Sequence, residues 1–153
     1  MNFSCEQLGG FGSLDFNLIE ETSNWPLVVT DQTSAQITIT PYTNDVEGII
    51  DQDSINIDDN TKESAEGIVH PITISFKFLT RSESLEQLLE QYKNKPGVVF
   101  ANLNNGFRKL YGTNEEPLYM TFKVDDGQKI DDNAGISIVI KGETRNRPVY
   151  YTP

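Results

Sequence analysis

The stretch VVFANLNNGFRKLYG, Val98 to Gly112, predicts a β-hairpin. Two apolar runs flank Asn105-Gly106, and the Asn-Gly dipeptide tolerates the positive φ angles of a tight two-residue turn. Outward from this hairpin, short apolar runs separated by turns continue along most of the chain. Strands are therefore expected to be the main secondary structure.

Alternation of apolar and polar residues, the period of a strand with one buried face, marks the other strands. In Ile68–Leu79, every second residue from Ile72 to Phe78 is apolar, and the residues between them are polar. Further strands are predicted at Gly12–Glu20, Leu27–Val29, Ala35–Tyr42, Pro117–Asp125 and Gly135–Glu143. About eight strands joined by short turns predict an antiparallel β-sandwich or barrel.

One helix is expected among these strands, at about residues 82–95. Four apolar residues there recur at helical spacing and form a single stripe: Leu85, Leu88, Leu89 and Tyr92. Pro96-Gly97 follows and is a typical stop signal. A helix with one apolar face must lie against a sheet, so we expect an α-helix that flanks the sandwich.

A long acidic loop is expected at residues 43–67, because this stretch is too polar for the core. Its isoleucines are few and scattered, which indicates that the loop can order against a partner. The eight acidic residues of this segment are Asp45, Glu47, Asp51, Asp53, Asp58, Asp59, Glu63 and Glu66. A loop of this length in a small domain is usually functional or disordered.

The formal net charge of −11 is distributed unevenly. Residues 1–66 carry 13 acidic side chains and only Lys62 as a base, whereas residues 67–153 carry 10 acidic and 11 basic side chains. Such a balance disfavours binding to the outside of a nucleic-acid duplex, which depends on Lys and Arg. It either keeps the protein soluble or lets the acidic part of one copy pair with a basic patch of another.

Residues that could catalyse a reaction or bind a metal ion are scarce in the 153-residue chain. His70 is the only histidine and lies inside a predicted strand, and Cys5 is the only cysteine. A nucleophile with its base, or a metal cage, needs more partners than these. We therefore expect no enzyme, no cofactor and no metal site.

The length and 37% hydrophobic content fit a single domain over residues 1–153. Neither a membrane span nor a signal peptide is visible, so synthesis in the cytoplasm is expected.

Several elements together resemble the small tail-tube and neck-ring proteins of tailed bacteriophages, especially phages of gut Bacteroides, including crAss-like phages. They are the N-terminal C-x-x-LGG at Cys5–Gly10, the polar loop after the ITITPY strand, the single helix, the GVVFANLNNGFRKLYG hairpin and the closing strand ISIVIKGETRNRPVYY. The resemblance spans nearly the whole chain as a pattern of elements.

This resemblance implies a virion structural protein that forms a ring, hexameric or larger, in the tail tube or head-tail connector. DNA would pass through the ring without specific binding, other virion tail or connector proteins would be partners, and no membrane is involved. Residues 45–66 would match the loop that reaches the next ring. The uncharged polar face of the predicted strand 35–42, formed by Gln36, Thr38 and Thr40, would suit a channel lining.

Two alternatives stay open. The terminal segment with Arg145, Arg147, Tyr150 and Tyr151 is expected either to dock on a neighbouring subunit or to cap its own sandwich, because tyrosine and arginine are enriched at interfaces. The chain could instead be an accessory carbohydrate-binding or adhesion module with Trp25 as its platform, although Trp25 as a core residue is preferred.

Overall fold

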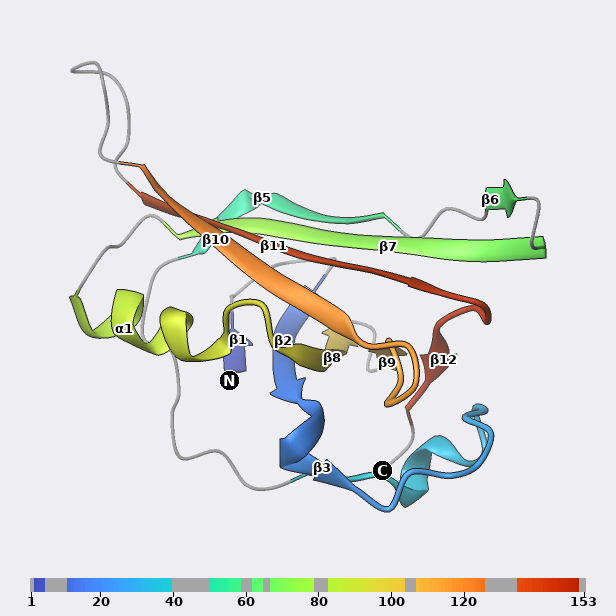
Figure 1. Ribbon diagram of the computed structural model, residues 1–153. Coiled ribbons are helices and arrows are strands. Elements are labelled where there is room, and N and C mark those ends of the chain that lie inside the picture. The colour runs from blue at the N-terminus through green and yellow to red at the C-terminus, as the bar shows by residue number, and fades with distance from the viewer. Residues whose placement is uncertain are drawn as a thin grey trace.

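The computed structural model describes residues 2–4, 11–39, 50–58, 62–64, 67–78, 83–103, 107–125 and 135–151. An antiparallel sheet curls into a half-barrel, and one helix flanks it (Figure 1). The predicted fold class, mainly antiparallel β with one helix, is confirmed. Within the described residues, no helix is long and apolar enough to cross a membrane.

Two parts of the half-barrel face each other across the core (Figure 1). The upper sheet contains β5 (Ile50–Asp58), β6 (Lys62–Ser64), β7 (Gly67–Phe78), β10 (Leu118–Asp125) and β11 (Gly135–Thr144). The lower sheet contains β1 (Asn2–Ser4), β2 (Phe11–Leu18), β8 (Pro96–Leu103), β9 (Arg108–Tyr111) and β12 (Val149–Tyr150). The two sheets join where the start of β8 pairs with the start of β10.

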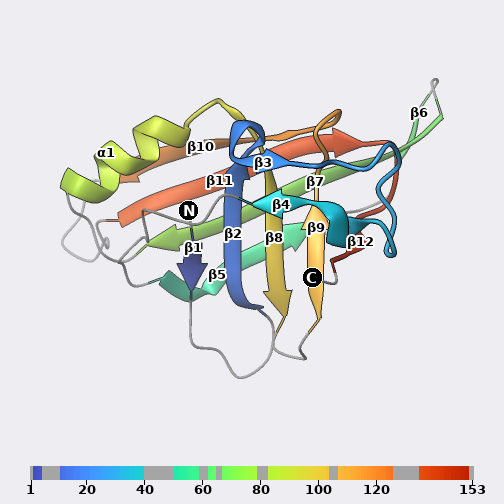
Figure 2. The same ribbon diagram turned by 90° about the horizontal axis from the view of Figure 1, so that it is seen from below.

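Below the lower sheet lies a third layer, built from residues 19–39 (Figure 2). It contains two short 3₁₀ helices and a separate two-stranded ladder. These elements are Ile19–Glu21, β3 (Thr22–Ser23), Ser34–Gln36 and β4 (Thr38–Ile39).

The main core lies between the two sheets, and α1 (Glu83–Tyr92) closes it at one side. The alternating residues of β7 point inward as predicted, since Ile72, Ile74, Phe76 and Phe78 are all buried. Leu85, Leu89 and Tyr92 of α1 are buried too, and Leu88 packs against the same core. Full burial of such side chains contributes about 1.5–3 kcal/mol each.

A second core lies on the other side of the lower sheet. Val98 and Phe100 of β8 and Leu110 of β9 pack there against Ile37 of the third layer. Val99 and Ala101 of β8 point the other way, into the main core. Strand β8 is thus buried on both faces, which explains its continuous apolar run.

Helix α1 is confirmed, but it ends at Tyr92, before the predicted end at about residue 95. Asn94 has a positive φ of 57°, a conformation that Asn tolerates better than most residues. Its backbone N–H donates to Met120 O of β10 at 2.9 Å. This contact fixes the chain where it leaves the helix, and Pro96 becomes the first residue of β8.

The prediction of a loop over residues 43–67 is wrong for much of that segment, because it contains β5 and β6. Ile57 pairs with Ile74 of β7 and packs against the main core, while its neighbours Asn56 and Asp58 are exposed. A polar strand is possible here because β5 lies at the end of the strand order. Ile57 thus orders against its own chain, at β7.

Two predicted strands are also corrected. Leu27–Val29 forms no strand, and its first two residues are exposed. In the segment 35–42, Gln36 belongs to a 3₁₀ helix and only Thr38–Ile39 is a strand, while residues 40–42 lie outside the described part. This segment belongs to the third layer because Ile37 anchors it in the second core.

The opening hairpin is confirmed as the antiparallel pair β8–β9, with a different register from that predicted. A two-residue turn at Asn105-Gly106 would place Tyr111 opposite Phe100, but Tyr111 lies opposite Val99. Residues 104–106 themselves are outside the described part of the chain. With the observed register, Tyr111 points into the main core and Leu110 into the second one.

Candidate functional site

The upper sheet has one face that no described element covers (Figure 1). We call the side chains of β10, β11 and β7 that point away from the main core the outer face. Strand pairing arranges them in three rows, which are Tyr119–Lys141–Thr73, Thr121–Val139–Ser75 and Lys123–Ser137–Lys77. The outer face therefore combines hydroxyl groups with three lysines. It can bind by hydrogen bonds and charge.

A hairpin projects from the upper sheet beyond the rest of the described chain (Figures 1 and 2). We call β6 together with the start of β7, residues 67–69, the projecting hairpin. Glu63 lies opposite Ile68, and the side chain of Ile68 is 56% exposed. An exposed apolar residue on a projecting element is suited to contact another protein.

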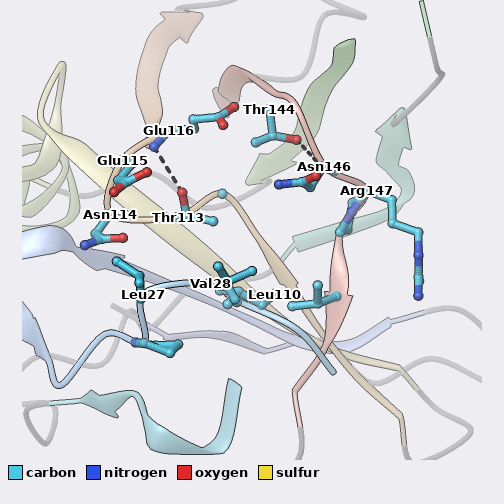
Figure 3. Close-up of a pocket in the computed structure, with 15 residues that line it drawn as sticks. Leu27, Val28, Leu110, Thr113, Asn114, Glu115, Glu116, Thr144, Asn146 and Arg147 are labelled. Atoms are coloured by element: carbon cyan, nitrogen blue, oxygen red, sulfur yellow. Dashed lines mark hydrogen bonds between the residues drawn. The ribbon is translucent and has the colours of Figure 1, made fainter. Parts of the chain in front are cut away.

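A pocket of about 190 Å³ opens between the third layer and two turns of the barrel (Figure 3). Its walls are formed by residues 26–29, 112–116, 144 and 146–149, together with Leu110. Leu27, at its rim, is 95% exposed. The volume lies below the range of about 300–1,000 Å³ that is usual for small-molecule sites. It is large enough for one side chain or a similarly small group.

Hydrogen bonds within the walls occupy several polar groups of this pocket. Glu116 N–H donates to Thr113 Oγ1 at 3.0 Å, and the Glu116 carboxylate accepts from Arg145 N–H at 2.6 Å. Thr144 Oγ1 donates to Asn146 O at 2.7 Å. These bonds stabilise the two turns and form no catalytic pair.

The terminal segment packs on its own chain through Arg147, Tyr150 and Tyr151. Tyr150 N–H donates to Asp31 Oδ1 at 2.9 Å, and Arg147 Nη2 lies 3.3 Å from Asp31 Oδ2. Tyr151 packs edge-on against Phe100, with 4.9 Å between ring centroids. The acidic partner of Arg147 thus lies in the same copy, while docking of this segment on a neighbouring subunit stays a prediction. Arg145 is exposed.

Two of the predicted channel residues, Gln36 and Thr38, do not lie on the large sheet. Gln36 and Thr38 are exposed in the third layer, where Thr38 Oγ1 accepts from Asn24 Nδ2 at 3.0 Å, and Thr40 is outside the described residues. Ile37 is buried, as the alternation predicts, but the described strand of this segment, Thr38–Ile39, belongs to the separate two-stranded ladder.

The predicted acidic loop is divided among several places. Asp58 of β5 and Glu63 of the projecting hairpin are exposed. Asp51 and Asp53 lie within β5. Asp45, Glu47, Asp59 and Glu66 fall outside the described residues. Three of the eight acidic residues, Asp51, Asp53 and Asp58, therefore belong to β5.

Two residues considered for function have structural positions. Trp25 packs against the second core, and its Nε1–H donates to Thr22 Oγ1 at 2.8 Å. Trp25 is partly buried there, which agrees with the preferred interpretation of Trp25 as a core residue. His70 lies on β7 opposite Thr144. In the described parts of the chain, no group of three or more His, Cys, Asp or Glu side chains could hold a metal ion.

Sequence reasoning noted the polar residues of single strands but missed the outer face as a whole. The alternation in residues 117–125 and 135–143 shows which side chains share a face of each strand. It does not show that these two strands are neighbours in the sheet. Comparisons with known protein families, curated proteins and solved structures found no match to this chain. Its function must be argued from its own surfaces.

Proposed function

We propose that this chain is a structural subunit that assembles with copies of itself into a ring of a phage virion, in the tail tube or the head-tail connector. The observation that carries the proposal is the projecting hairpin. Its pairing is local, between β6 and the start of β7, and Ile68 at 56% exposure has no apolar cover there. Such an element gains contacts when a second subunit packs against it.

The rest of the molecule supports an assembling role. The sheet is an open half-barrel, and β1 and β5 end its strand order. An open sheet with exposed ends can continue into the sheet of a neighbour. Repetition of one such contact by a rotation closes a ring.

The overall charge fits a ring through which DNA passes. A net charge of −11 opposes tight binding of phosphates, so DNA would slide past without being held. The protein would be made in the host cytoplasm and incorporated into the virion, next to other tail or connector proteins. It would act by shape and contact, without catalysis.

The test is the assembly state of the purified protein. Light scattering after size-exclusion chromatography, followed by negative-stain electron microscopy, should reveal rings or short tubes at high protein concentration. Ile68→Asp should abolish them, because the projecting hairpin then carries a charge into the contact. Leu27→Asp is the matched control, since it places the same charge on a more exposed leucine away from the hairpin. A wild-type protein that is monomeric at every concentration would refute the proposal.

A further inference from the structure

The charges on the upper sheet are arranged from one side to the other. Lys123 and Lys141 lie on β10 and β11 at one side and are both exposed. At the other side, β5 carries Asp51 and Asp58, paired in register with Lys77 and Thr73 of β7. Asp58 is exposed as well. The same sheet therefore has a basic strip, formed by Lys123 and Lys141, and an acidic end, formed by β5.

The lysines of the outer face lie close enough to one another to act as one charged surface. Lys123 and Lys77 are two strands apart in one row, which is about 10 Å at the usual spacing of strands. Lys141 lies opposite Tyr119, four residues from Lys123, or about 13 Å along the strand. These separations are comparable with the Debye length of about 8–10 Å in physiological salt.

Lys123 and Lys141 are available to a partner. Neither side chain has a hydrogen bond or an ion pair within the described residues. Most other described bases differ: Arg147 pairs with Asp31, Lys93 lies over the ring of Phe122, and Lys109 lies over the ring of Tyr150. Lys123 and Lys141 thus present charge that no described residue neutralises.

We propose that the outer face binds the acidic β5 end of a second copy of this chain. The inference rests on the proposed function and specifies one of its contacts. Charge complementarity identifies the occupant, because residues 1–66 carry a net charge of −12 and β5 belongs to that part. When copies follow one another around a ring, the acidic β5 end of one copy can lie against the basic strip of the next, and the same contact repeats at every step. Exposed Tyr119 and Thr121 add contact area and hydrogen-bonding groups beside the lysines.

A nucleic acid is a weaker candidate for this face. The three lysines are the only bases on it, and Asp58 at the β5 end would repel phosphates. Tight binding to duplex DNA usually draws on more Lys and Arg side chains that neutralise phosphates. A second copy of the chain carries both signs of charge and can complement the basic strip and the acidic end. A nucleic acid is uniformly negative and can complement only the basic strip.

The test is a charge swap. The double variant Lys123→Glu, Lys141→Glu should weaken self-association by about tenfold or more, because it turns attraction into repulsion at the contact. Asp58→Lys should weaken it as well. A mixture of the two variants should associate again, because the swapped charges then match. The matched control is Lys95→Glu, Arg145→Glu, which changes the charge equally at exposed sites off the outer face.

Sedimentation velocity at low and high salt measures these associations, and circular dichroism verifies that each variant is folded. The milder Lys123→Gln, Lys141→Gln variant should give an intermediate loss and serves if the charge reversal disturbs the sheet. Self-association that survives the charge reversal would overturn the face assignment and leave the ring proposal standing. A wild-type protein that never associates would overturn both. Binding of a duplex DNA fragment that disappears in the charge-reversed variant would identify the partner as nucleic acid and refute the proposal.

Discussion

The two sheets of the half-barrel bury different numbers of faces. In the lower sheet, β8 is covered on both sides, with Val99 in the main core and Val98 in the second core. In the upper sheet, Ile138 of β11 is fully buried, while Val139 beside it lies on the outer face. A strand buried on both faces has a continuous apolar run, and a strand buried on one face alternates. The difference shows which sheet is left for partners.

The largest expected effect tests the one-sided burial of the upper sheet. Ile138→Ala should lower the free energy of unfolding by about 2–5 kcal/mol, because it leaves a cavity in the main core. Val139→Ala is the control on the same strand and should change it by less than about 1 kcal/mol, since its side chain faces outward. Urea unfolding followed by circular dichroism measures both. Similar losses at the two positions would mean that the outer face is covered.

The regular strands of the fold could be predicted because their own residues record burial. The alternation at Ile72–Phe78 and the stripe from Leu85 to Tyr92 both describe contacts with the core, and the structure contains both. Such patterns depend on the local period alone.

Other elements depend on distant residues and could not be predicted. Strand β5 is polar and forms because β7 lies beside it. The segment around Ile37 looked like a barrel strand, but it covers Val98 and Phe100. Sequence alternation gives the two faces of a strand and does not say which other element covers either face. For the same reason Gln36 and Thr38 were assigned to a channel, while the lysines of the outer face were not grouped.

The second prediction tests the two-sided burial of β8. Val98→Ala and Val99→Ala should each lower the free energy of unfolding by about 1–3 kcal/mol, because each removes two buried carbons and leaves a gap. The similarity of the two losses is the decisive result, and chemical denaturation of each variant measures it. If Val98→Ala leaves the free energy of unfolding unchanged while Val99→Ala lowers it, the third layer does not pack firmly on the lower sheet.

The third prediction concerns the contact between α1 and the third layer. Burial and the nearby carboxylates of Glu21 and Glu20 raise the pKa of Tyr92 above its ordinary value of 10.0, and its hydroxyl donates to Glu21. Tyr92→Phe removes that bond and should lower the free energy of unfolding by about 1 kcal/mol at neutral pH.

The same variant has a predicted pH dependence. Above pH 10.0 the unfolded chain releases the Tyr92 proton while the folded chain still holds it, so the folded state loses stability as pH rises. The stability advantage of wild type over Tyr92→Phe should therefore be complete below that pH and shrink above it. Urea unfolding of both proteins on either side of pH 10.0 measures this difference. An advantage that stays constant or grows with pH would contradict the assignment.

The smallest expected effects concern the end of the chain, which joins the lower sheet to the third layer. Asp31 accepts from Tyr150 N–H at 2.9 Å and also meets Arg147, whereas Arg147 is 64% exposed and has this one carboxylate as its partner. Asp31→Ala should therefore lower the free energy of unfolding by about 0.5–1.5 kcal/mol, because the Tyr150 N–H loses a charged acceptor. Arg147→Ala should cost less than about 0.5 kcal/mol, since an exposed ion pair contributes little and is screened by salt. Thermal unfolding at low and high salt separates the two variants: the Asp31 loss should persist at high salt. A larger loss for Arg147→Ala would mean that its side chain has a further partner, such as a neighbouring subunit, and would support the prediction that this segment docks between copies.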